Sequence, residues 1–68
     1  MMSIKDLYLA CGNMHSEMLL RVRRKSGFQY DVVYNGKFSK MPDEVRNQIV
    51  VVFEIDSDLE GALFIIPA

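Results

Sequence analysis

The stretch that decides the fold is residues 17–35, which read EMLLRVRRKSGFQYDVVYN. Apolar and polar side chains alternate through its first eight and its last eight residues, which is the period-two pattern of half-buried strands. Lys25-Ser26-Gly27 lies between these segments and predicts a compact turn, with glycine at a position where a positive φ is useful. The pattern therefore predicts an antiparallel β-hairpin.

A short helix is predicted before the hairpin, at residues 4–11. Ser3 is its expected N-cap, and Asp6 makes an imperfect capping box because Glu or Gln is preferred at that position. Apolar side chains follow at helical spacing as far as Cys11, and Gly12 can take the left-handed conformation that ends a helix. A helix of two turns is unstable alone, so we expect it to pack on the sheet.

Two more strands are predicted after the hairpin, at residues 48–55 and 62–66. Asn35-Gly36 is a tight-turn signal that either ends the first hairpin or begins a second short one. A helical turn is expected over residues 41–47, because a proline suits its first position and two acids follow. The order α-β-β-short helix-β-β predicts an α+β fold, with one helix on a four-stranded, mainly antiparallel sheet. The 68 residues form a single domain, 1–68.

One small helix is too little to cover both faces of such a sheet. The last two strands are apolar on both faces, and an exposed apolar patch usually marks an interaction surface. The alternative is that turns and residues 37–47 fold over the second face. We otherwise expect a homo-oligomer or a complex with a host protein. The predicted interface comprises Leu19, Val33, Val50, Val52 and either Phe64 or the Leu63 row.

Charge is divided unevenly along the chain. Residues 21–40 hold six cations and one anion, whereas residues 41–68 hold six anions and one cation. The whole chain, with residues 1–20 included, has a net charge of −1. The simplest interpretation is that folding places the two sets side by side. The alternative is a nucleic-acid-binding surface, which a near-neutral chain disfavours because such domains are usually clearly basic. Its residues would be Arg21, Arg23, Arg24 and Lys25.

Residues 56–61 resemble the first half of a calcium loop. Asp56, Asp58 and Glu60 stand at its first, third and fifth positions, and a glycine follows. The twelfth position holds Pro67 where a bidentate glutamate is needed, and strands replace the flanking helices. We therefore favour an acidic turn and expect no metal and no cofactor.

No constellation of residues points to catalysis. Cys11 and His15 are four positions apart, but we expect a core thiol and a surface imidazole without a third group to orient them. One cysteine excludes an internal disulfide, and one cysteine with one histidine excludes a zinc knuckle. No apolar run is long enough to span a membrane, and no signal peptide is evident. These features predict a soluble, cytoplasmic, non-enzymatic protein with no membrane partner.

Three short motifs and a closing hairpin occur in order along the chain. They are Ser3-Ile4-Lys5-Asp6-Leu7, Tyr34-Asn35-Gly36-Lys37, Met41-Pro42-Asp43-Glu44-Val45 and the hairpin over residues 51–66. This order resembles small hypothetical proteins carried by phages and integrated mobile elements of Gram-positive bacteria. The resemblance implies an α+β accessory protein with no known activity. By analogy of size and origin, such a protein would be an inhibitor that binds a host defence protein.

Overall fold

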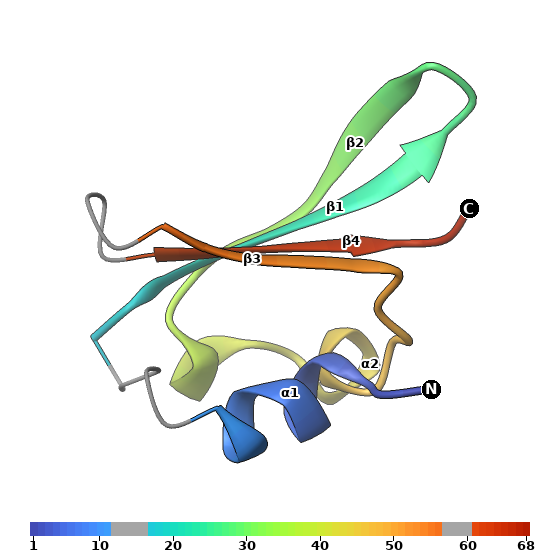
Figure 1. Ribbon diagram of the computed structural model, residues 1–68. Helices are drawn as coiled ribbons and strands as arrows, with labels where there is room; N and C mark the ends of the chain where they lie inside the picture. The colour runs from blue at the N-terminus through green and yellow to red at the C-terminus, as the bar shows by residue number, and fades with distance from the viewer. Residues whose placement is uncertain (12–16, 57–60) are drawn as a thin grey trace.

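The protein folds as two layers, with its helices on one side of a four-stranded sheet (Figure 1). The computed structural model describes residues 1–11, 17–56 and 61–68. The α+β class predicted from the sequence is confirmed. The elements in chain order are α1 (Ile4–Ala10), β1 (Leu19–Ser26), β2 (Gln29–Gly36), the 3-10 helix η1 (Phe38–Lys40), α2 (Asp43–Arg46), β3 (Val52–Asp56) and β4 (Gly61–Ile66).

The strands lie in the order β2-β1-β4-β3. β1 pairs with β2 and β3 pairs with β4 in antiparallel fashion, as two hairpins would, but the central strands β1 and β4 are parallel. The chain passes from β2 at one edge to β3 at the other through η1 and α2, which lie on the helix side of the sheet (Figure 1). This crossover sets the direction of β3, and through it the direction of β4.

The core lies between the helices and the sheet. Alternation along β1 and β4 turns every second side chain toward the helices, as the period of a strand requires. The ring of Phe64 is fully buried and stacks on Phe53 with centroids 5.1 Å apart. Tyr8 of α1 stacks on Phe38 of η1 at 4.0 Å and joins the helical segments. The buried cluster comprises Ile4, Met18, Leu20, Val22, Met41, Ala62, Phe64 and Ile66.

The helix α1 begins as the sequence predicts. The hydroxyl of Ser3 accepts a hydrogen bond from the Asp6 amide at 3.1 Å, and the Asp6 carboxylate accepts one from the Ser3 amide at 3.3 Å. The capping box is therefore complete with aspartate in place of glutamate. Only Ile4 of this helix is fully buried, so packing on the sheet holds a helix too short to be stable alone. The proposed C-cap at Gly12 lies outside the described residues.

The strand predicted over residues 48–55 is wrong in its first half, because β3 begins only at Val52. Gln48 and Val50 pair instead with the N-terminal segment: the Ile4 amide donates to the Gln48 carbonyl at 3.0 Å, and the Val50 amide donates to the Met2 carbonyl at 3.0 Å. Only the Val51 amide of this stretch donates to β4, at the Ile65 carbonyl and 2.8 Å. Backbone groups committed to this contact cannot extend the β3–β4 ladder. Apolar composition alone does not reveal such a competing partner.

The segment after β2 forms η1 instead of a second hairpin. Its helical part is also shorter than predicted, since α2 spans Asp43–Arg46. Arg46 Nη2 donates hydrogen bonds to the carbonyls of Phe38 at 2.9 Å and Ser39 at 3.2 Å, and its guanidinium lies over the Phe38 ring. This arginine therefore fixes α2 against η1 beneath the sheet.

Candidate protein-interaction surface

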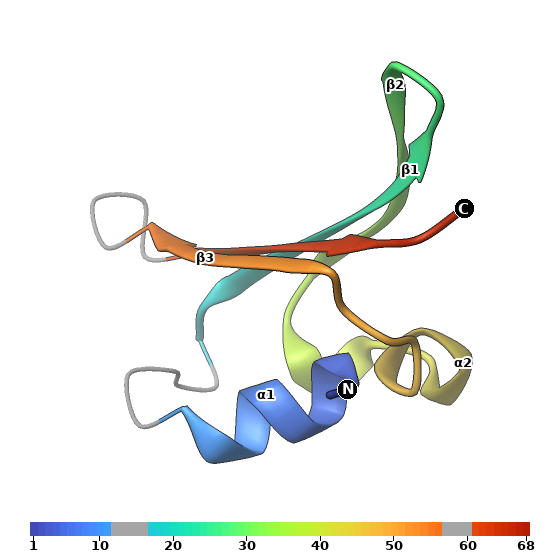
Figure 2. The same cartoon turned by 45° about the vertical axis from the view of Figure 1, so that its right-hand side comes forward.

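The sheet face turned away from the helices, here called the outer face, is not covered by any described element (Figure 2). The strand register aligns its side chains in cross-strand rows. The first row across β2, β1, β4 and β3 holds Asn35, Arg21, Leu63 and Glu54. The second row holds Val32, Arg23, Ile65 and Val52.

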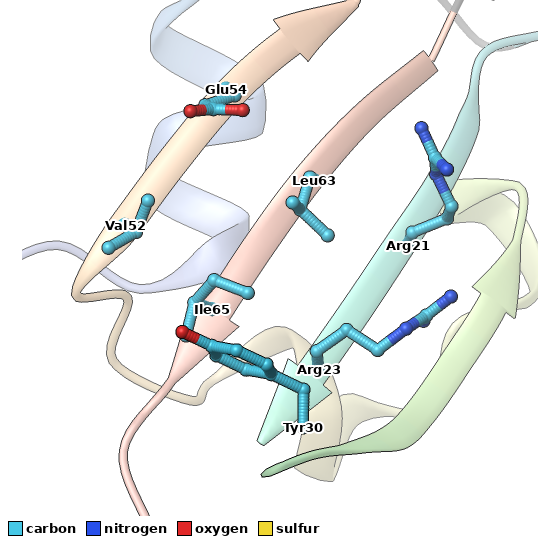
Figure 3. Close-up of a pocket in the computed structure, with 7 residues that line it drawn as sticks. All are labelled: Arg21, Arg23, Tyr30, Val52, Glu54, Leu63 and Ile65. Atoms are coloured by element: carbon cyan, nitrogen blue, oxygen red, sulfur yellow. The ribbon is translucent and has the colours of Figure 1, made fainter. Parts of the chain in front are cut away.

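The outer face is hollowed. The ladder between β1 and β2 is irregular between Val22 and Arg23, as in a β-bulge, and bulges bend and twist strands. Beyond this point residues 24–32, here called the hairpin arm, rise away from the helix layer (Figure 2). The resulting hollow has a volume of about 450 Å³ and an open mouth (Figure 3). Its lining residues are Arg21, Arg23, Tyr30, Val52, Glu54, Leu63 and Ile65.

The floor of the hollow is apolar and its two flanks carry opposite charges. Leu63 and Ile65 of β4 form the floor, with Arg21 on the β1 side and Glu54 on the β3 side (Figure 3). Among the described residues, no hydrogen bond or ion pair engages the side chain of either charged residue. The Nε atom of Arg21 is buried and has no hydrogen-bond partner within that part of the chain. A buried donor without a partner costs free energy, so the burial of this nitrogen is uncompensated within the described part of the chain.

Arg23 differs from Arg21 because its guanidinium donates hydrogen bonds to acceptors within the chain. Its Nη1 donates to Asn35 Oδ1 at 2.8 Å and to the Val22 carbonyl at 3.1 Å. The side chain thus lies along the β1–β2 pair and forms part of the wall of the hollow (Figure 3). Arg21 and Glu54 are therefore the charged groups of the hollow that remain open to a ligand.

The interface predicted from the sequence lies only partly on this face. Leu19 and Val52 are on it and are about half exposed, at 48% and 47%. The placement of Phe64 on the second face is wrong, because its side chain is fully buried in the core. Val33 and Val50 also pack against the core cluster on the helix side. A strand that is apolar on both faces shows no alternation in its sequence. The sequence therefore could not decide whether the Phe64 row or the Leu63 row faces outward, and the strand register was needed to decide it.

The residues that the sequence analysis missed are Tyr30, Val32, Glu54 and Ile65. Tyr30 and Val32 are 57% and 65% exposed and extend the apolar surface of the outer face onto the hairpin arm. Their positions follow from the bulge, which shifts the phase of β2 relative to β1. Uninterrupted alternation along β2 would put Tyr30 and Tyr34 on the same face, whereas Tyr34 packs against the core.

The four basic residues proposed for nucleic-acid binding do not form one stripe. Arg21, Arg23 and Lys25 alternate along β1 and belong to the outer face. Arg24 lies in register with Ile66, whose side chain is in the core, and it donates to the Pro67 carbonyl at 3.4 Å. Alternation along the strand predicts this division, with Arg24 near the other three but not on their face. Binding of nucleic acid by this strand remains a prediction.

The other sequence motifs contribute no described site. Asp58 and Glu60 of the calcium-loop resemblance lie outside the described residues, and Asp56 is the last residue of β3. His15 also lies outside them, so the expectation that it is a surface imidazole and forms no catalytic pair with Cys11 stays a prediction. Among the described residues, no group of three His, Cys, Asp or Glu side chains is placed to hold a metal ion. In the same part of the chain, no helix is long and apolar enough to cross a membrane.

Comparison with known proteins gives no relative from which a role could be carried over. No protein-family model, no curated protein and no solved structure matches the chain significantly.

Proposed function

We propose that this protein is a non-enzymatic interaction module that binds another protein through the outer face of its sheet. The observation that carries the proposal is the hollow on that face, with its apolar floor and its open Arg21 and Glu54. Binding surfaces combine a desolvated apolar centre with polar groups that set orientation. Exposed apolar patches on small domains commonly mark such surfaces.

A protein partner fits this surface better than a nucleic acid. A phosphate backbone is followed by cations without interspersed anions, whereas Glu54 stands on the hollow's flank opposite Arg21. Arg23 is already engaged by Asn35, so it offers less to a phosphate. Arg21 and Glu54 on either side of Leu63 are instead complementary to a partner surface that carries both a negative and a positive group. The expected partners are a second copy of the chain or a host protein, in keeping with the resemblance to mobile-element proteins.

The experiment is a capture assay with a matched control. Tagged wild-type chain, Leu63→Glu and Leu9→Glu are incubated with bacterial lysate, with and without nuclease treatment, that also contains a differently tagged copy of the wild-type chain. Leu63 forms the floor of the hollow, whereas Leu9 is an exposed leucine of α1 in the other layer. Wild type and Leu9→Glu should retain a protein that Leu63→Glu loses. Equal retention by all three chains, or binding that nuclease abolishes, would contradict the proposal.

A further inference from the structure

We infer that the protein bound by the outer face is a second copy of this chain. The two copies pack face to face about a two-fold axis that runs along β4, so that Arg21 of each copy meets Glu54 of the other. This inference rests on the proposed function and names its partner. It follows from the way charge and apolar surface are distributed over the outer face.

The distribution is self-complementary. Arg21 and Glu54 both lie in register with Leu63, one strand away from it on opposite sides. The axis is parallel to β4 and lies in the interface, between the β4 strands of the two copies. Rotation by 180° about it exchanges the β1 side with the β3 side and keeps each cross-strand row at the same height along the strands. Leu63 then faces Leu63 of the second copy, and each arginine faces a glutamate. Isologous interfaces of homodimers require this match between a surface and itself.

The other in-plane two-fold axis does not give this match. An axis that crosses the strands at the Leu63 row would place Arg21 against Arg21 and Glu54 against Glu54. An axis between the two rows would place Arg21 against Arg23. Like charges buried together are strongly unfavourable, so the charges select the axis along β4. Sheets that stack face to face also keep their strands within about 30° of one another, which this axis provides.

The hairpin arm fits the same arrangement. The arm rises on the outer side of the sheet (Figure 2). It does so at the end of the sheet where β3 begins, since Val32 of the arm and Val52 of β3 belong to one cross-strand row. After the rotation, the arm lies beside the β3 edge of the second copy. Tyr30 and Val32 on the arm are exposed, as are Val51 and Val52 at that edge. Each arm would therefore cover apolar side chains and an open strand edge of the other copy.

The pairing is tested by exchanging the charges. Light scattering from micromolar to millimolar concentration should give a dimer for the wild type. Arg21→Glu and Glu54→Arg should each weaken dimerisation at least about tenfold, because each creates two pairs of like charges across the interface. An equimolar mixture of the two variants should form a heterodimer, since the two carboxylates of the Arg21→Glu chain then face the two guanidinium groups of the Glu54→Arg chain. The double variant should regain the homodimer.

Arg24→Glu is the matched control, because Arg24 is on the same strand but on the opposite face. It should leave the dimer intact, and circular dichroism establishes that each variant is folded. A wild type that stays monomeric at millimolar concentration overturns the inference, as does a dimer whose variants fail to rescue each other on mixing. A monomeric wild type that still captures a protein in a Leu63-dependent manner overturns this inference alone. Loss of all Leu63-dependent capture overturns the proposed function as well.

Discussion

Arg21 and Glu54 lie in one cross-strand row of the sheet, with Leu63 between them on the intervening strand. Neighbouring strands are about 4.8 Å apart, so two strand spacings separate their backbones. Among the described residues neither side chain forms an ion pair, and the Arg21 Nε is buried without a partner. Arg21 and Glu54 therefore lie on the same face of the sheet, two strands apart, but form no ion pair with each other.

The buried Nε of Arg21, which has no hydrogen-bond partner in the described part of the chain, leads to a prediction about stability. Replacing Arg21 by leucine should stabilise the isolated chain by about 1 kcal/mol, because it removes a buried donor whose desolvation is uncompensated. Leucine also suits a strand position beside Leu63. Urea unfolding at low concentration, followed by circular dichroism, measures the change in the free energy of unfolding.

Arg23 provides the control for this prediction. It is on the same face of β1, but its guanidinium donates to Asn35 and to backbone carbonyls. Arg23→Leu should destabilise the chain by about 1 kcal/mol, because those hydrogen bonds are lost. If both substitutions shift the urea midpoint in the same direction, the contrast drawn between the two arginines is mistaken.

The assignment of β4 side chains to two faces makes a second prediction. Phe64 is fully buried and stacked on Phe53, whereas Leu63 lines the open hollow. Phe64→Ala should cost about 3–5 kcal/mol, which is close to the whole stability of a domain this small. Leu63→Ala should cost less, about 1–2 kcal/mol, because Leu63 is only partly buried and borders the open hollow.

Phe64→Leu keeps this second comparison measurable if the alanine variant does not fold. It should cost less than about 2 kcal/mol and still exceed the cost of Leu63→Ala. Thermal and urea unfolding of both variants give the comparison. A greater loss for Leu63→Ala would mean that the faces of β4 are reversed.

The sequence predicted the fold class because its signals are local. Period-two alternation around Lys25-Ser26-Gly27 predicted the first hairpin, and Ser3 with Asp6 predicted the start of α1. Both predictions depend on contacts between residues close in the chain. They required no knowledge of the sheet order.

The outer face depends on long-range pairing and could be predicted only in part. Leu19 and Val52 were placed on it, but Phe64 was not separable from Leu63, because β4 is apolar on both faces. The parallel pairing of β1 with β4 determines which of the two faces the helices. The bulge between Val22 and Arg23 then changes the phase of β2, and no alternation pattern reveals it.

The N-cap of α1 gives a third prediction. Ser3→Ala removes the acceptor of the Asp6 amide hydrogen bond and should cost about 1 kcal/mol. The same substitution at Ser26, an exposed residue at the end of β1, is the control and should change stability by less than about 0.5 kcal/mol. Urea midpoints of the two variants are compared with that of the wild type. Equal midpoints for both variants would show that the capping box contributes nothing measurable.

The last prediction concerns the glycine that ends β2. Gly36 has φ +148°, and a β-carbon there would lie 2.8 Å from the Tyr34 hydroxyl oxygen, which donates to the Lys37 carbonyl at 2.7 Å. Gly36→Ala should cost at least about 2 kcal/mol, because a strained backbone and a steric clash combine. Gly27→Ala should cost about 1 kcal/mol, since its φ of +62° is strained for alanine but no atom lies within 4 Å.

Tyr34→Phe separates the clash from the strain at Gly36. It removes the oxygen that the new β-carbon would meet, and the ring carbon at 3.2 Å becomes the nearest atom. The double variant should therefore be less destabilised than the sum of the two single variants, by about 1 kcal/mol. Urea unfolding of all four proteins completes the cycle. Strict additivity would mean that the cost of Gly36→Ala comes from backbone strain alone, because relief of the contact with Tyr34 would then have changed nothing.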